Sequence, residues 1–230
     1  MNSHVRPWWM ARSQAVVPRD DLVQLGSEAG AWIVPLSLIG PESVVMCFGV
    51  GGDASFDLAL IERTGCRVHA FDPTPRARSF GQQTAEEHPA FVFHEVGLWS
   101  SDTELEFFEP AREGHVSYSA TNLQGTSKSV RCPVKRLSTL MGELGVDRVD
   151  LLKIDVEGAE YEGLSGMLDD GIRPGVLGVE FDQPVPMRQT RKMLDRLRGE
   201  GYAVVAIRGW NYTLVRDDAS RVASEPEGQA

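Results

Sequence analysis

Glycines and a carboxylate stand close together in the segment VVMCFGVGGDASFDLAL, residues 44–60, in a pattern that could bind a nucleotide. An apolar run typical of a buried strand leads into Gly49 and Gly51, and a helical pattern follows. With Ala54 these glycines satisfy G-x-G-x-x-[GA], and Asp72 lies 23 residues after Gly49. This is the dinucleotide-binding fingerprint, which by itself predicts an oxidoreductase that uses NAD.

Asp53 argues against a dinucleotide at this loop. A pyrophosphate needs the free N–H groups and the positive dipole end of the following helix, where a carboxylate would occupy the donors and repel phosphate. The simplest role for Asp53 is a helix cap, worth about 1 kcal/mol. A ligand without phosphates removes the conflict, and S-adenosylmethionine has none. Its sulfonium and ammonium groups are cationic, so it also tolerates nearby carboxylates. The glycines would still let the backbone approach it, and Asp72 could accept hydrogen bonds from its ribose.

A second group of charged residues lies in DLLKIDVEGAEYEGL, residues 150–164. Lys153, Asp155 and Glu157 fall around the end of an apolar run, and they would share one side of a strand that continued that far. Charges in an apolar strand are costly unless they are paired or used. Two interpretations stay open, namely an ion pair of Lys153 with helix-capping acids, or a catalytic site.

Two further features could carry chemistry. Glu180 and Asp182 end the next apolar run, and together with Asp155 they would form an oxygen-rich pocket that suits Mg²⁺. His115 stands in the polar segment EGHVSYSATN and could act as a general base, although an exposed loop histidine is the simpler interpretation.

Apolar runs alternate with helical patterns along most of the chain. The expected strands cover residues 44–49, 67–72, 90–99, 150–158 and 175–182, and the fourth of these runs into a turn at its end. Two β-type additions are expected at 103–110 and 129–137, and an antiparallel pair in 202–216. The expected helices cover residues 53–65, 74–88, 137–146, 159–168 and 186–201. The alternation predicts an α/β fold with a parallel sheet covered on both faces. Ligands of such sheets bind beyond the carboxyl ends of the strands, where the motifs lie.

Composition narrows the class of protein. The chain has 230 residues, 42% of them hydrophobic, and a formal net charge of -10. The acidic balance argues against nucleic acid or an anionic membrane as a partner. The three cysteines are scattered without a CxxC motif, and no signal peptide or membrane-span pattern is visible, so a cytoplasmic protein is expected.

The chain is expected to form one main domain. Residues 1–40 are interpreted as a cap or lead-in that includes Trp8 and Trp9, and residues 41–216 as the domain itself. Residues 217–230 hold almost no large apolar side chains and are predicted to be disordered. The oligomeric state stays open, with a homodimer as one alternative.

Four segments together resemble the FkbM-type methyltransferase family, over about residues 26 to 216. They are FGVGGDASFDLALI, VHAFDPTPRA, LLKIDVEGAEYEGL and GYAVVAIRGWNYTLVR. That family is similar to class I S-adenosylmethionine-dependent methyltransferases, so the resemblance implies a doubly wound, mostly parallel seven-stranded sheet with a terminal antiparallel strand. It also implies methylation of a hydroxyl on a small molecule such as a sugar or secondary metabolite.

The resemblance implies a role for each candidate residue. Asp72 would hold the ribose, and Asp155 would be the base or would orient the acceptor, with Glu157 beside it and Lys153 balancing charge. A carboxylate is a weak base for an alcohol, so burial or a metal ion would have to assist Asp155. The other expected cofactor contacts are Gly49 and Gly51 at the methionine part, Pro73 and Thr74 at the turn, and Gly97, Leu98 and Trp99 at the adenine.

One departure concerns the end of the first strand. Many class I enzymes carry an acid where Met46 or Cys47 stands, to hold the amino group of the cofactor, whereas here the acid comes later, as Asp53. The amino-acid end of the cofactor would therefore be held differently. Two other classes remain as alternatives, an NAD-dependent oxidoreductase and a binding protein that kept the fold without catalysis.

Overall fold

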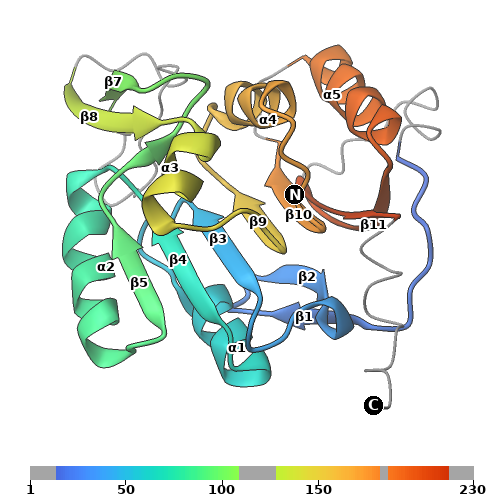
Figure 1. Cartoon of the computed structure of the whole chain (residues 1–230), viewed down its shortest axis with the longest axis horizontal. Helices are drawn as coiled ribbons and strands as arrows, with labels where there is room; N and C mark the ends of the chain where they lie inside the picture. The colour runs from blue at the N-terminus through green and yellow to red at the C-terminus, as the bar shows by residue number, and fades with distance from the viewer. Residues whose placement is uncertain (1–13, 109–127, 182–185, 218–230) are drawn as a thin grey trace.

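A computed structural model describes residues 14–108, 128–181 and 186–217 and is built around a seven-stranded sheet (Figure 1). The strands lie in the order β11-β12-β10-β9-β3-β4-β5. Their bounds are β3 Val44–Phe48, β4 Arg67–Phe71, β5 Phe91–His94, β9 Leu151–Ile154, β10 Val176–Glu180, β11 Tyr202–Arg208 and β12 Asn211–Arg216.

Strand directions confirm the predicted class of fold. Strands β10, β9, β3, β4 and β5 pair in parallel, and β12 runs antiparallel to both β10 and β11. The segment 202–216 is thus the expected antiparallel pair, inserted with its last strand between β11 and β10. This is the doubly wound α/β sheet with one reversed strand that the resemblance implied.

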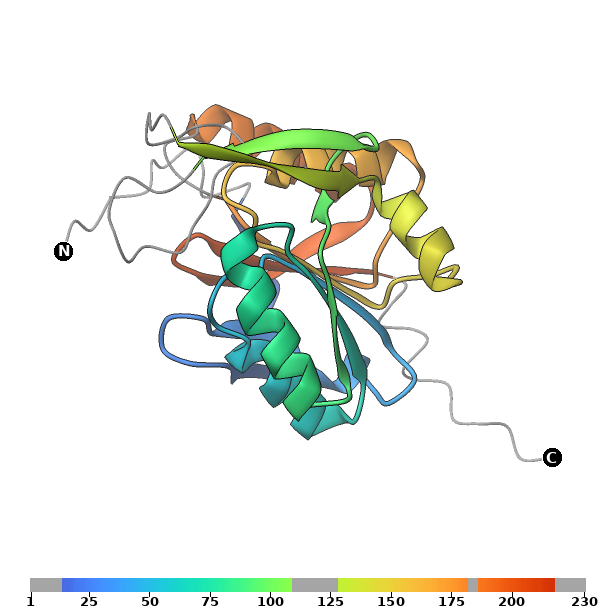
Figure 2. The ribbon, with the colours of Figure 1, turned by 90° about the vertical axis from the view of Figure 1, so that its left-hand side faces the viewer.

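Helices cover both faces of the sheet because its strands are apolar on both sides. Val45 and Cys47 face one core cluster, whereas Met46 and Phe48 face the other, and all four are buried. Figure 2 shows helices on both sides of the sheet. On one side lie α1 Ser55–Thr64 and α2 Pro75–Glu87, and on the other lie α3 Leu137–Leu144, α4 Glu160–Asp169 and α5 Met187–Gly199.

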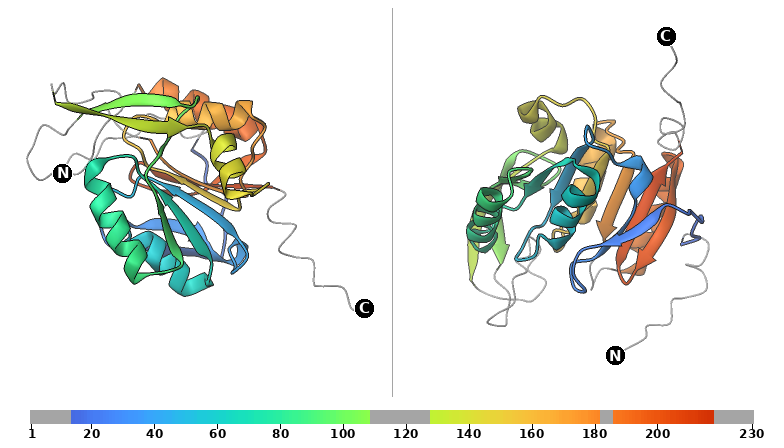
Figure 3. Two further views of the ribbon diagram at one scale, coloured as in Figure 1. Left: turned by 60° about the vertical axis from the view of Figure 1, so that its left-hand side comes forward. Right: turned by 90° about the horizontal axis from the view of Figure 1, so that it is seen from below.

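A hairpin covers the part of the sheet that α1 and α2 leave open. Its strands, β1 Leu22–Leu25 and β2 Trp32–Pro35, pair antiparallel and are followed by a short 3-10 helix, Leu36–Leu38. The hairpin crosses β11 and β12 in the view from below (Figure 3). Trp32 is buried there because Gly178 of β10 leaves room, since a Cβ at that glycine would lie 3.1 Å from the indole ring.

A second, three-stranded sheet lies outside the main one. Its strands are β6 Gly97–Leu98, β7 Thr103–Phe108 and β8 Ser129–Lys135, in the order β6-β8-β7. The expected β-type additions are therefore present. The single strand expected over 90–99 is instead two, because β5 ends at His94 and β6 pairs with β8 in the other sheet. Phe107, Cys132 and Val134 form the small core of this sheet.

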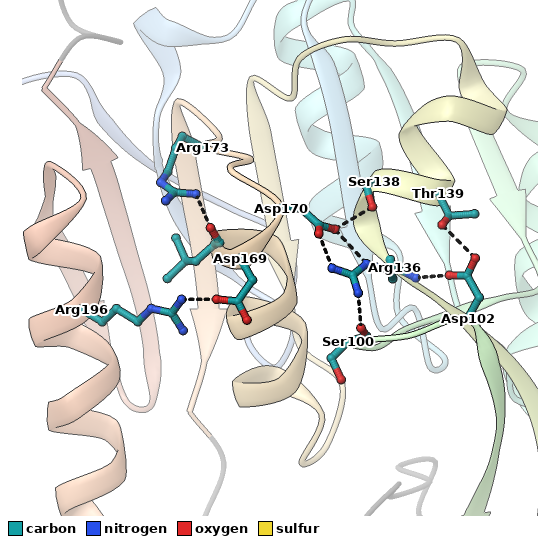
Figure 4. Close-up of polar contacts among 10 residues, drawn as sticks. Ser100, Asp102, Arg136, Ser138, Thr139, Asp169, Asp170, Arg173 and Arg196 are labelled. Carbon is teal, nitrogen blue, oxygen red and sulfur yellow. Dashed lines mark hydrogen bonds and ion pairs between the residues drawn. The ribbon is translucent and has the colours of Figure 1, made fainter.

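Arg136 fastens the second sheet to the helices (Figure 4). Its guanidinium donates to the Asp170 carboxylate at the end of α4 and, over 3.0 Å, to the Ser100 carbonyl. Its backbone N–H donates to Asp102, which also accepts from Thr139 in α3. These bonds hold β6 and β7 in place, and both strands contribute residues to the cavity described below.

Two helical glycines offer a matched test of this packing. A Cβ on Gly81 of α2 would lie 2.3 Å from the Phe93 ring, whereas a Cβ on Gly142 of α3 would meet nothing within 4 Å. We expect Gly81→Ala to destabilise the protein by about 1–3 kcal/mol through overpacking. Gly142→Ala should stabilise it by about 0.5–1 kcal/mol through helix propensity. Urea unfolding measures both values, and a stabilised Gly81→Ala would contradict the close approach of α2 to β5.

Candidate active site

A cavity of about 430 Å³ opens beyond the carboxyl ends of the parallel strands. Its size lies in the usual range for small-molecule sites, and its place is the one expected for ligands of this fold. Strands β3, β4, β9 and β10 contribute the residues that follow or end them. The lining holds six carboxylates and one lysine, namely Asp53, Asp57, Asp72, Asp155, Glu157, Glu180 and Lys153.

The glycine loop after β3 presses against the end of β9. Gly49 has a φ of 87°, and a Cβ there would lie 1.7 Å from the backbone oxygen of Asp155. No residue with a side chain fits that contact. The loop is held from the other side as well, since the Gly49 N–H donates to the Phe71 carbonyl of β4 over 2.9 Å.

Asp72 connects the glycine loop to the start of α2. Its Oδ2 accepts from the N–H groups of Val50 (3.1 Å) and Gly51 (2.9 Å). Its Oδ1 accepts from both the N–H and the hydroxyl of Thr74, at 2.9 and 2.7 Å. The carboxylate is 6% exposed and lines the cavity. Both expected partners of the turn, Pro73 and Thr74, line the cavity with it.

Asp53 lies one residue before Ala54, the N-cap of α1, and borders the cavity. Its Oδ1 accepts from the Ser55 N–H over 2.8 Å, and its Oδ2 accepts from the Ser27 hydroxyl over 2.6 Å. Burial raises the pKa of Asp53, but the hydrogen bonds from Ser27 and Ser55 outweigh it, so that the pKa lies below its ordinary value. Asp53 therefore bonds the first N–H of α1, although it is not the N-cap residue itself.

Lys153 is the cation of the cavity. It is 6% exposed, and its Nζ donates to the Gly49 carbonyl over 3.1 Å and lies 3.3 Å from Asp155 Oδ2. The same Nζ lies 5.3 Å from the centre of the Trp32 ring, in cation–π range. Burial lowers the pKa of Lys153, but the charges of Asp155 and Asp57 raise it more, so its pKa lies above the ordinary value.

The turn after β9 differs from the expected strand. The strand ends at Ile154, so alternation does not extend to Asp155 and Glu157, and Glu157 has a φ of 48°. A shared strand face for Lys153, Asp155 and Glu157 required the strand to continue that far, and it does not. The turn is instead shaped by the fully buried Glu160, whose carboxylate accepts from the N–H groups of Val156 (3.1 Å) and Gly158 (3.0 Å).

The structure brings together most of the predicted site residues but not all of them. Gly97 and Leu98 line the cavity, whereas Trp99 packs against the core of the second sheet. His115 and Asp182 lie outside the described residues. Among the described residues no group of three or more potential metal ligands of the His, Cys, Asp and Glu types comes together, so the Mg²⁺ hypothesis has no cluster behind it.

Not every residue of the cavity was singled out from the sequence, and three large or charged side chains are among those missed. Trp32 comes from the hairpin, Phe107 from β7, and Asp57 from the first turn of α1. For Asp57 a signal was present, because it stands between Phe56 and Leu60 on the buried face of that helix. A carboxylate at such a position is costly unless it has a use.

Comparison with known proteins places the chain in a family. The sequence model of the Methyltransferase FkbM domain matches residues 43–204, and the chain belongs to that family. Its described core is thus an S-adenosylmethionine-dependent methyltransferase domain. In the described part of the chain, no helix has the length and apolar character needed to cross a bilayer.

Two relatives and one solved structure show how similar individual proteins are to this chain. "Methyltransferase 1" of Beauveria bassiana is 34% identical over 45% of this chain, and the match spans about half of that relative, 49%. The "31-O-demethyl-FK506 methyltransferase FkbM" of Streptomyces tacrolimicus is 27% identical over 72% of this chain and 75% of its own length. Fibrillarin of Aeropyrum pernix, a solved structure, is 8% identical with a TM-score of 0.45, over 88% of this chain and 85% of that one.

Glu160 gives the site a testable pH dependence. Burial raises the pKa of Glu160 to about 7, although the hydrogen bonds from Gly158 and Val156 act in the opposite direction. The folded state therefore binds this proton more tightly than the unfolded state, and stability from this group is lost as pH rises from about 4.5 through 7. The loss amounts to about 3 kcal/mol.

Glu160→Gln keeps an acceptor oxygen but cannot ionise, so we expect it to lack this loss. Urea unfolding at pH 5 and pH 8 would show the variant gaining stability relative to the wild type at the higher pH. Glu162→Gln, which changes an exposed acid of the same helix, controls for the loss of one charge. Parallel profiles for wild type and Glu160→Gln would rule out a raised pKa at Glu160.

Proposed function

We propose that the protein is an S-adenosylmethionine-dependent O-methyltransferase that acts on a hydroxyl of a small molecule, such as a sugar or a secondary metabolite. The observation that carries the proposal is the occupancy of the loop donors. The N–H groups of Val50 and Gly51 are taken by Asp72, and that of Ser55 by Asp53. A pyrophosphate would need these donors free, so a cofactor with cationic groups fits the loop better than NAD.

The cofactor's chemistry leaves the protein a limited task. S-adenosylmethionine supplies a methyl group already activated on a sulfonium, so the chain's residues position the acceptor and receive its proton. Gly49 and Gly51 allow the backbone to approach the methionine part. Asp72 would accept hydrogen bonds from the ribose, and Gly97 and Leu98 would contact the adenine.

Asp155 is the group we assign to the acceptor. It follows β9 directly, its side chain is 27% exposed, and it lines the cavity beside Lys153. An ionised carboxylate accepts hydrogen bonds only, so Asp155 would orient a hydroxyl donor and take up its proton as the methyl group is transferred. Glu157 adds a second carboxylate next to it. The name of the Streptomyces tacrolimicus relative, a 31-O-demethyl-FK506 methyltransferase, supports a hydroxyl acceptor.

Cofactor binding tests the first half of the proposal. S-adenosylhomocysteine at 100 times its Kd should stabilise the protein by about 2.7 kcal/mol, which raises the Tm by several degrees, and NAD should not. Asp72→Ala should weaken S-adenosylhomocysteine binding at least about tenfold, because it removes a charge-assisted acceptor. Asp195→Ala removes an exposed carboxylate of α5 that does not line the cavity and serves as the control. Stabilisation by NAD alone would overturn the assignment.

Methyl transfer tests the second half. With labelled S-adenosylmethionine and a panel of sugars and hydroxylated metabolites, we expect Asp155→Asn to reduce turnover at least about 100-fold, the usual contribution of a general base. Its affinity for S-adenosylhomocysteine should stay within a factor of a few. If Asp155→Asn turns over like the wild type, Asp155 has no role in proton removal. If the wild type binds the cofactor but methylates nothing in a broad panel, a silent binding protein becomes the better description.

A further inference from the structure

Asp57 is a buried acid with an unused acceptor that faces the cavity. It lies in the first turn of α1, is 3% exposed, and belongs to the cavity lining. Within the described ranges, its Oδ1 is the buried side-chain polar atom without a hydrogen-bond partner. An acid in this position is costly unless a donor reaches it. The unpartnered oxygen therefore indicates that the cavity binds a ligand with a hydrogen-bond donor.

The neighbours of Asp57 show which donor fits. The Cys47 thiol lies close to its carboxyl group but brings no charge. Lys153 is the nearby cation, yet its Nζ is engaged by the Gly49 carbonyl and Asp155 Oδ2. Burial raises the pKa of Asp57, and the charge of Lys153 offsets this only in part. A cationic donor would supply both the missing hydrogen bond and the missing charge.

Asp53, the acid first considered for this purpose, is already satisfied. Each of its oxygens accepts a hydrogen bond, one from Ser27 and one from Ser55. Asp57 differs from it by one helical turn, by its deeper burial and by its unpartnered oxygen. Between the two, Asp57 is the acid with a buried oxygen that no protein group bonds.

The position of Asp57 along the sheet identifies the part of the ligand. Asp72 follows β4, whereas Asp57 lies near Cys47 of β3 and Lys153 of β9. In the sheet β3 lies between β4 and β9. A cofactor whose ribose is held at Asp72 and whose chain crosses the glycine loop therefore ends at Asp57 and Lys153. In S-adenosylmethionine that end carries an α-ammonium group.

We propose that Asp57 binds the α-ammonium group of the cofactor's methionine part. The inference rests on the cofactor of the proposed function. It accounts for the apolar strand end at Met46 and Cys47, because the acid that other class I enzymes carry there is supplied here by the first turn of the following helix.

The proposal can be tested by comparing how Asp57→Asn binds two ligands, one with the amino-acid end and one without it. Asp57→Asn keeps the shape of the side chain and removes its charge. We expect isothermal titration to show that S-adenosylhomocysteine binds at least about tenfold more weakly to Asp57→Asn than to the wild type. 5'-Methylthioadenosine, which lacks the whole amino-acid end, should bind equally to both. Asp195→Asn, an exposed acid of α5 that is paired with Arg198 and does not line the cavity, should leave both affinities unchanged.

The outcomes separate this inference from the proposed function. Equal weakening of both ligands by Asp57→Asn would mean a purely structural role for Asp57 and overturn the inference, as would unchanged affinity for both. A wild type that binds neither ligand would remove the proposed function and the inference with it. Should Asp57→Asn fail to fold, a deaminated analogue of S-adenosylhomocysteine tests the wild type directly. It should bind at least about tenfold more weakly than S-adenosylhomocysteine, and equal binding would overturn the inference.

Discussion

The site depends on the contact between the glycine loop and the end of β9. At Gly49 the backbone approaches Asp155 so closely that a Cβ would lie 1.7 Å from its carbonyl oxygen. Lys153 strengthens the same junction, since its Nζ binds the Gly49 carbonyl and pairs with the Asp155 carboxylate. The loop for the cofactor and the acid for the acceptor therefore keep a fixed relative position, which a transfer between two bound molecules requires.

The acids of the cavity differ in how many hydrogen bonds they accept from the protein. Asp72 accepts from three backbone N–H groups and a hydroxyl, so its role is to shape the loop as well as to face the ligand. Asp53 is satisfied by helix and hairpin donors, whereas Asp57 keeps one oxygen unpaired. Because one lysine lies among six carboxylates, the cavity favours a ligand with positive charge.

Local patterns predicted the sheet and much of the cavity edge. The order of strands and helices followed from apolar periodicity, and Asp72 followed from its spacing after Gly49, because both are encoded within short segments. Residues that reach the cavity from a distance could not be placed in this way. Trp32 arrives by a hairpin that crosses β10–β12, and Phe107 by a sheet outside the main fold. Glu157 does not share a strand face with Lys153, because the strand ends at Ile154 rather than continuing.

The glycine pattern itself could not distinguish a dinucleotide from S-adenosylmethionine. Glycines report only that backbone and ligand come close, and both cofactors require that. The difference lies in which acceptors hold the loop N–H groups, and here two side-chain carboxylates do so. Asp53 was the part of the sequence that carried this information, because an acid at the start of the helix excludes phosphate there. Many different ligands bind to this fold. Which of them fits depends on whether the few loop N–H groups are free or already bonded to a carboxylate.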